Sequence, residues 1–248
     1  MNHSFFIGAT AAYQQDKRMG IHGNNIANVN TYGFKAERSR FTQLMYADLP
    51  VASGGNDETG AGTALLTSAT NHAAGNAAHT ERDLDFMIQG DGYFGVADLA
   101  TGEVTYTRCG AFSKSRLVQP TGEIDEYGRP VLEERWYLSD GKERFVMGES
   151  GGMIEIVNNE PSEKIGVFDF LNYDGMRHVE DTRFVPADKN GGLRRGTGEV
   201  VSGYLEISNV DLAEELTKVI ESQRAYGMAL KLVQASDEIE TTINGLRG

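Results

Sequence analysis

A glycine-rich run at residues 90–95 is the part of this chain whose spacing comes nearest to a ligand-binding motif. The run Gly90-Asp91-Gly92-Tyr93-Phe94-Gly95 fits the pattern G-x-G-x-x-G, which can cradle a dinucleotide. Such a site needs a following helix whose N-terminus faces the pyrophosphate. Residues 98–102 instead predict another turn into a strand, and no basic residue lies nearby. The run therefore predicts a β-turn.

Acidic residues near the same run do not complete a calcium loop. Such a loop needs glycine at its sixth position and glutamate at its twelfth. Counting from Asp83 gives Ile88 and Phe94 at these positions. The spacing therefore predicts no calcium site here.

The histidines and the single cysteine show no spacing for metal or nucleophilic chemistry. The histidines are His3, His22, His72, His79 and His178. The sequence contains no G-x-S-x-G, H-E-x-x-H or C-x-x-C motif. Cys109 is the only cysteine, and a lone cysteine is usually a small buried hydrophobic residue. We expect no catalytic residues, no metal site and no cofactor, and hence a protein that is not an enzyme.

The element that organises the chain is a predicted C-terminal helix of about 35 residues within 208–246. Ser208 with Asp211 predicts its start. One apolar stripe contains Leu212, Leu216, Val219, Ile220, Tyr226, Leu230 and Val233. A second stripe contains Ala225, Met228, Leu232, Ile239, Ile243 and Leu246. A helix with two stripes is either central to its own domain or has two partners. We favour two partners, at least one of them another chain.

Residues 4–27 predict a second helix, followed by an asparagine-rich exit. Its apolar side carries Phe5, Ala9, Ala12, Met19 and Ile26. This segment alone does not distinguish packing on its own domain from an intermolecular role. Asparagine side chains bond nearby backbone groups and tolerate left-handed conformations. Asn24, Asn25 and Asn28 therefore predict a polar backbone lock between two elements.

Composition divides the chain into four predicted segments: 1–46, the N-terminal helix and turn; 47–80, a flexible Gly/Ser/Ala-rich arm; 81–203, a β domain; and 204–248, the long helix. The fold class is thus α+β, with an all-β domain inserted between two terminal helices. Strands are expected at 86–88, 93–97, 104–107, 135–138, 144–147, 154–157, 165–170 and 184–186. The stretch 113–120 lacks a clear turn.

Net charge and hydropathy limit the partners. The formal net charge is −13, which argues against nucleic acid or an anionic membrane. No apolar run reaches the length of a membrane span, and residues 1–5 lack the features of a cleavable signal peptide. We expect no membrane insertion.

Three stretches, in order, resemble the bacterial flagellar rod and hook family. They are the asparagine-rich stretch 24–35, the stretch 84–94 continued by 106–112, and the stretch 203–212 continued by 223–226. The resemblance implies an axial subunit of the basal body, in the rod rather than the longer hook. It implies a helical tube in which the N- and C-terminal helices pair as an inner, coiled-coil-like layer, with the β domain outside. Partners would be copies of the chain, other axial rod and hook proteins, and the flagellar export apparatus. The chain would reach the rod of the basal body without a cleaved signal.

The stripes and motifs together predict a subunit-assembly surface. Its residues are Phe5, Ala9, Ala12, Met19, Asn24, Asn25, Asn28, Thr31, Gly33, Phe34, Leu212, Leu216, Val219, Gln223, Arg224, Tyr226, Leu230, Leu232, Ile239 and Ile243. Arg224 is predicted to be solvated or to form an interchain ion pair. The alternatives are a hook-type axial protein and an oligomeric β-domain module that binds a cell-wall polymer or a protein. For that module Trp136, Tyr137, Glu133 and Glu134 form the candidate cluster, although core packing of Trp136 is expected.

Overall fold

The computed structural model describes residues 3–43, 47–50, 56–59, 63–124, 130–180 and 182–247. The chain divides into two units. The helical unit contains Met1–Val29, Ala36–Asn71 and Val210–Gly248, and the β unit contains Asn30–Lys35 and His72–Asn209. The terminal helices and the β-rich middle confirm the α+β class.

Two α-helices, one short 3-10 helix and a series of short strands make up the described residues. The helices are α1 (His3–Ala27), η1 (Asp188–Asn190) and α2 (Leu212–Arg247). The strands are β1 (Glu37–Gln43), β2 (Ala47–Pro50), β3 (Asn56–Thr59), β4 (Thr63–Thr70), β5 (Ala77–His79), β6 (Phe86–Gln89), β7 (Tyr93–Asp98), β8 (Val104–Thr107), β9 (Ser113–Ile124), β10 (Pro130–Ser139), β11 (Arg144–Val146), β12 (Ile156–Val157), β13 (Glu160–Pro161), β14 (Val167–Phe170), β15 (Arg177–His178), β16 (Arg183–Val185), β17 (Leu193–Arg195), β18 (Glu199–Ser202) and β19 (Tyr204–Glu206).

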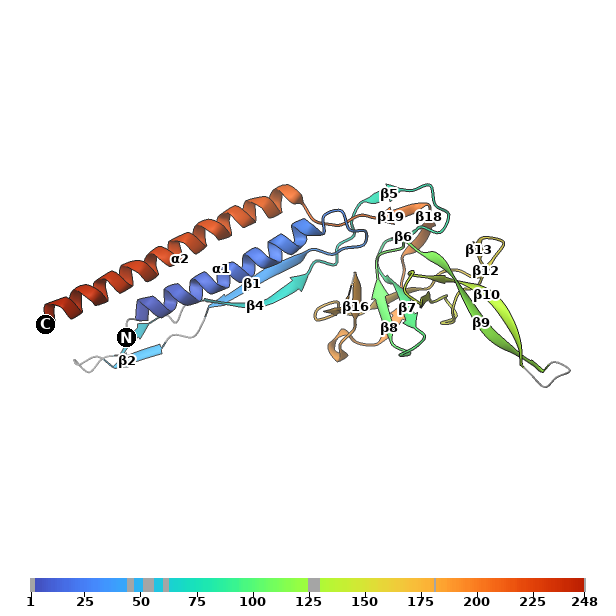
Figure 1. Ribbon diagram of the computed structural model, residues 1–248, viewed down its shortest axis with the longest axis horizontal. Helices are drawn as coiled ribbons and strands as arrows, with labels where there is room; N and C mark the ends of the chain where they lie inside the picture. Colours follow the sequence, from blue (N-terminus) through green and yellow to red (C-terminus); the bar gives the residue numbers. More distant parts are fainter. Residues whose placement is uncertain are drawn as a thin grey trace. The chain divides into compact units, whose positions relative to one another are not determined.

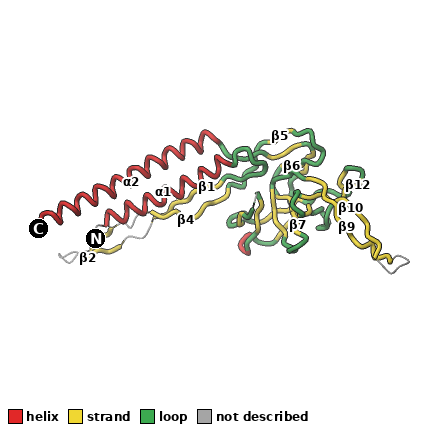
Figure 2. Tube along the Cα trace, viewed as in Figure 1, coloured by secondary structure: helices red, strands yellow, loops and turns green. Residues whose placement is uncertain are grey.

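In the helical unit α1 and α2 lie antiparallel, side by side (Figures 1 and 2). The Ser4 and Ser236 hydroxyls are 2.8 Å apart at one end of the pair, and His22 lies 2.6 Å from Glu215 at the other. Gly8 keeps the helices close, since a Cβ there would lie 2.9 Å from a Val233 methyl.

The start of α2 differs from the predicted one by a few residues. Asp211, rather than Ser208, caps the helix: its Oδ1 accepts hydrogen bonds from the backbone N–H groups of Ala213 and Glu214, at 2.9 and 3.2 Å. This is the usual N-cap geometry, because the first N–H groups of a helix have no intrahelical acceptor.

Part of the segment expected as a flexible arm forms strand structure in the helical unit. β4 pairs with β1 from Glu37↔Thr70 to Gln43↔Thr63. The backbone N–H of Leu65 also donates to the Gln14 side chain on α1, at 3.0 Å. Backbone pairing and threonine-rich sequence thus order a stretch that has little apolar surface to bury. Residues 51–55 and 60–62 of the expected arm lie outside the described residues.

In the β unit the main sheet follows the order β15-β16-β8-β7-β11-β10-β9, and β14 pairs with both β7 and β17. The glycine-rich run forms the turn between β6 and β7, as predicted. Gly90 and Gly92 have φ of 110° and 125°, which favours glycine. The larger hydrophobic cluster contains Leu84, Phe86, Ile88, Phe94, Phe112, Leu138, Val146, Ile154, Ile156, Ile165 and Val167.

All eight strands predicted in the β region are confirmed, with boundary shifts of one to a few residues. The longest strand, β9, was not predicted. It pairs with β10 from Ser139↔Ser113 toward the tip of a long ribbon (Figure 1). The expectation that Trp136 packs in the core was wrong, since its side chain is 48% exposed. Trp136 lies on β10, opposite Arg116 of β9.

Candidate assembly surface

The face of α2 that meets α1 is lined by small and polar residues. Its buried positions recur every seven residues: Glu215, Ser222, Ala229 and Ser236. At 100° per residue these four positions lie between the two predicted apolar stripes. We call this face the seam. The pairing of α1 and α2 therefore covers only those stripe residues that lie next to the seam.

The apolar stripes of α2 remain largely exposed in the single chain. In the first stripe Val219, Tyr226 and Val233, which border the seam, are half-buried. The large hydrophobic residues of the two stripes that stay exposed are Leu212, Leu216, Ile220, Met228, Leu230, Leu232, Ile239, Ile243 and Leu246. Gln223 and Arg224 are exposed as well. An exposed apolar surface of this extent is typical of an interaction site.

The last turns of α2 extend past the start of α1. Ser236 faces Ser4, the second residue of α1, and every position from 237 to 246 of α2 is exposed. Ile239, Ile243 and Leu246 have exposed fractions of 56, 49 and 83%. Among the described residues nothing covers this end of the helix.

The predicted site residues of α1 are divided between an inner and an outer side. Ala12 is buried and Met19 half-buried, whereas Phe5 and Ala9 are exposed. Phe6 and Tyr13, at the edge of the predicted apolar side, are also exposed. Ala12 therefore supports the pairing of α1 with α2 inside the subunit.

The asparagine-rich exit of α1 is a backbone lock, as predicted. Asn25 is fully buried, donates to the Glu37 carbonyl at 2.8 Å and accepts from the Glu37 N–H at 2.9 Å. Its amide also donates to Glu215 at 3.0 Å. Asn28, half-buried, donates to the carbonyl of the exposed Asn24 at 2.9 Å. The buried Asn25 thus ties the exit of α1 to β1 and to the start of α2.

Glu215 is the charged member of the seam. Burial alone would raise the pKa of its carboxyl group. Hydrogen bonds from Asn25, His22 and Lys218 outweigh burial and lower that pKa below its usual value. The carboxylate therefore stays ionised where α1 ends against α2.

Three further predicted residues belong to the β unit. Thr31 is half-buried, and Gly33 and Phe34 are buried. Gly33 has φ of 69°, and a Cβ there would lie 2.3 Å from the backbone nitrogen of Cys109. Only glycine fits this close approach, so Gly33 fixes the turn onto the β unit.

A buried ionic cluster, which sequence reasoning missed, lies beside this turn. Glu206 accepts from Lys35 at 2.5 Å and from Arg108 at 3.1 Å, and all three side chains are almost fully buried. The Lys35 ammonium also donates to the Ala73 carbonyl at 2.7 Å. Burial lowers the pKa of Lys35 more than the adjacent carboxylate raises it.

Each member of this cluster comes from a different one of the three stretches noted in the sequence. Lys35 ends the first stretch, Arg108 lies in the second and Glu206 in the third. The sequence offered one sign of this cluster: each of the three stretches carries a charged residue among apolar residues or turn-forming residues. The role of the ionic cluster is structural, because it joins the turn at 30–35 to β19 and to the end of β8.

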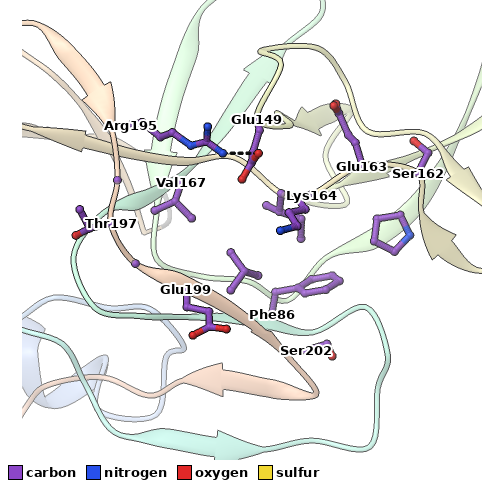
Figure 3. Close-up of a pocket in the computed structure, with 15 residues that line it drawn as sticks. Phe86, Glu149, Ser162, Glu163, Lys164, Val167, Arg195, Thr197, Glu199 and Ser202 are labelled. Atoms are coloured by element: carbon purple, nitrogen blue, oxygen red, sulfur yellow. Dashed lines mark ion pairs between the residues drawn. The ribbon is translucent and has the colours of Figure 1, made fainter.

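The β unit contains two open hollows of similar size. One groove of about 770 Å³ is lined by residues 161–165 and 195–200 among others (Figure 3). Two of its carboxylates have partners: Glu149 pairs with Arg195, and Glu163 accepts from Ser150 at 2.9 Å. Within the described residues there is no group of His, Cys, Asp or Glu side chains that could hold a metal ion. No described helix is long and apolar enough to cross a membrane.

Two family models match the ends of the chain. The model described as "Flagella basal body rod protein" matches residues 6–35, and "Flagellar basal body rod FlgEFG protein C-terminal" matches residues 201–246. These regions contain α1 with its asparagine-rich exit and β19 with most of α2.

Similar proteins align over nearly the whole chain. The flagellar basal-body rod protein FlgG of Bacillus subtilis (strain 168) is 30% identical over 96% of this chain and 97% of its own length. FlgG of Buchnera aphidicola subsp. Acyrthosiphon pisum (strain APS) is 30% identical, with 95 and 96% covered. The rod protein FlgF of Salmonella typhimurium (strain LT2) is 26% identical, with 99 and 98% covered. From this full-length similarity, together with the two matching terminal regions, we conclude that the chain belongs to the flagellar basal-body rod protein family.

Proposed function

We propose that this chain is an axial structural subunit of the flagellar rod, which assembles through its terminal helices into a helical tube. The observation that carries the proposal is the uncovered end of α2, with Leu232, Ile239, Ile243 and Leu246 exposed. Fully burying one such side chain stabilises a contact by about 1.5–3 kcal/mol. Several of them along one helix provide a substantial driving force for subunit association.

The spacing of these residues suits a neighbouring helix. Leu232, Ile239 and Leu246 recur every seven residues, and Ile243 lies one turn from Ile239. This pattern favours knobs-into-holes packing in a coiled-coil-like layer. The partner surface on a second subunit would be the exposed apolar residues of α1 and the other stripe of α2. Such contacts join two different surfaces and therefore generate open helical assemblies.

Membership of the family supports the remaining parts of the proposal. Copies of this chain and other axial rod and hook proteins would be the partners of the two stripes. The chain would reach the rod through the flagellar export apparatus without a cleaved signal peptide, as the resemblance implies. The buried residues Ala12, Asn25, Gly33 and Phe34 would act in assembly only indirectly, by fixing the fold of each subunit.

We expect Ile243→Asp to abolish incorporation into the rod, because a charge would be buried in the intersubunit contact. The isolated chain should keep its fold, since Ile243 is exposed there. The measurement is the amount of variant in basal bodies isolated from a strain lacking the native gene, together with swimming motility. Circular dichroism and thermal unfolding of the purified variant check the fold.

The matched control is Thr242→Asp, which adds the same charge next to Ile243, at an exposed position on the face of α2 that lies opposite the seam and belongs to neither stripe. This variant should assemble. Normal incorporation and motility of Ile243→Asp would refute an assembly role for the end of α2.

A further inference from the structure

Trp136 is the only tryptophan of the chain, and it lies in the open next to a small hollow of the β unit. The hollow has a volume of about 170 Å³ and is lined by Trp136, Lys114, Ile156, Asn158 and Asn159. A half-exposed indole offers a large, rigid apolar face together with an N–H donor. Ile156 is buried and forms part of the core beneath.

The polar rim of this hollow is held in place by turn geometry. Asn158 and Asn159 connect β12 to β13 and have φ of 54° and 70°. Two successive left-handed residues in a two-residue hairpin loop form a type I′ turn, which asparagine favours. Lys114 donates to Oδ1 of Asn159 at 2.6 Å, which orients that amide. The Asn158 amide has no hydrogen-bond partner in the part of the chain that the structure describes.

Two larger hollows lie next to this one and share lining residues in turn. Asn158 and Asn159 also line a hollow of about 810 Å³, whose other residues include Glu160, Pro161 and Arg82. That hollow shares Phe86, Pro161 and Ser202 with the groove of Figure 3. The three hollows therefore lie in succession along residues 158–165, an arrangement that suits a linear polymer better than a compact small molecule.

The chemistry of this path favours an uncharged sugar chain. A pyranose with equatorial hydroxyl groups presents a flat C–H face that can stack on an indole. Its hydroxyl groups can donate to carboxylates and to asparagine carbonyl oxygens, and can accept from asparagine N–H groups. The net charge of −13 and the acidic residues of the path disfavour a polyanion.

We propose that Trp136, Asn158, Asn159 and Lys114 form a binding site for a neutral, gluco-configured oligosaccharide, which extends along the groove. Trp136 stacks on one sugar ring, and the two asparagines bind its hydroxyl or acetamido groups. The site is separate from the surfaces proposed for assembly, since all its residues lie in the β unit.

The test is a titration of the purified full-length chain with chitotetraose and with cellotetraose. Because Trp136 is the only tryptophan, its fluorescence reports on this site alone. We expect a saturable emission change with a dissociation constant on the order of 1 mM. By titration calorimetry or NMR, Trp136→Ala should weaken binding about tenfold, and Asn159→Asp should weaken it about fivefold. Trp136→Phe, which keeps a ring for stacking, should retain part of the affinity.

The exposed Tyr13, on the helical unit, supplies the control: Tyr13→Ala should leave sugar binding unchanged. Absence of a saturable change with either sugar would overturn the proposal. So would an emission shift that depends on protein concentration without sugar, because a second copy of the chain would then cover Trp136. Failure of the assembly proposal is distinguishable, since Trp136→Ala is expected to enter the rod normally.

Discussion

Glu206→Gln is expected to lower the free energy of unfolding of the β unit by about 3–5 kcal/mol. Glutamine keeps the shape of the side chain and an acceptor oxygen, but it removes the only negative charge of the cluster. Lys35 and Arg108 would remain as two buried cations, 2.5 and 3.1 Å from an uncharged amide. The measurement is urea unfolding of the full chain, followed by near-ultraviolet circular dichroism of the buried Tyr93 and Tyr106.

The matched control for this substitution is Glu134→Gln. Glu134 pairs with Arg116 at 3.1 Å on the surface, with both side chains more than half exposed. Exposed ion pairs contribute little, so we expect a change within about 0.5 kcal/mol. If Glu206→Gln changed stability as little as this control, the cluster would not be holding the turn at 30–35 onto the β unit.

The second large expected effect is a dependence of the free energy of unfolding on pH, which arises from His72. Its Nδ1 lies 2.5 Å from the Tyr93 hydroxyl, and its ring stacks on Tyr173 with centroids 5.1 Å apart. Burial, followed by the nearby charge of Lys35, lowers the pKa of His72 to about 4; Asp174 opposes this shift and Arg108 adds to it. The unfolded chain therefore binds a proton near pH 6.5 that the folded chain binds only near pH 4.

Stability is accordingly expected to fall as the pH drops through this window. The free energy of unfolding that His72 contributes is present in full above about pH 6.5 and decreases by about 3 kcal/mol by pH 4. Carboxyl groups titrate in the same range, so the test compares native chain and His72→Asn by urea unfolding at both pH values. The native chain should lose about 3 kcal/mol more than the variant. Equal losses would show that His72 is not kept neutral by its surroundings.

Local signals were sufficient to predict most elements of this fold. The 3.6-residue periodicity located α1 and α2, and short apolar runs separated by glycine turns located β6, β7 and β8. Asn25 was expected to lock the exit of α1 and does so through two hydrogen bonds to Glu37. These features depend on residues close together in the chain, where propensity and capping decide the outcome.

Local sequence patterns did not predict the strand β9. Its sequence begins with serines and charged residues in alternation, and its few apolar residues, Leu117, Val118 and Ile124, do not follow the period of two that marks one apolar face. It is ordered by backbone pairing with β10, and hydrogen bonds between backbone groups leave no side-chain pattern in the sequence. The same reason explains β4, which lies in a segment of low hydrophobicity and pairs with β1.

The sequence by itself determined that this chain has two terminal helices, that α2 carries apolar residues on more than one side, and that the middle is β structure. Only the tertiary structure decided that α1 covers the seam of Glu215, Ser222, Ala229 and Ser236, which leaves most of both stripes exposed. Tertiary structure alone also joined Lys35, Arg108 and Glu206. Periodicity records which side chains avoid water, but small seam residues and buried ion pairs avoid it only once a specific partner is in contact.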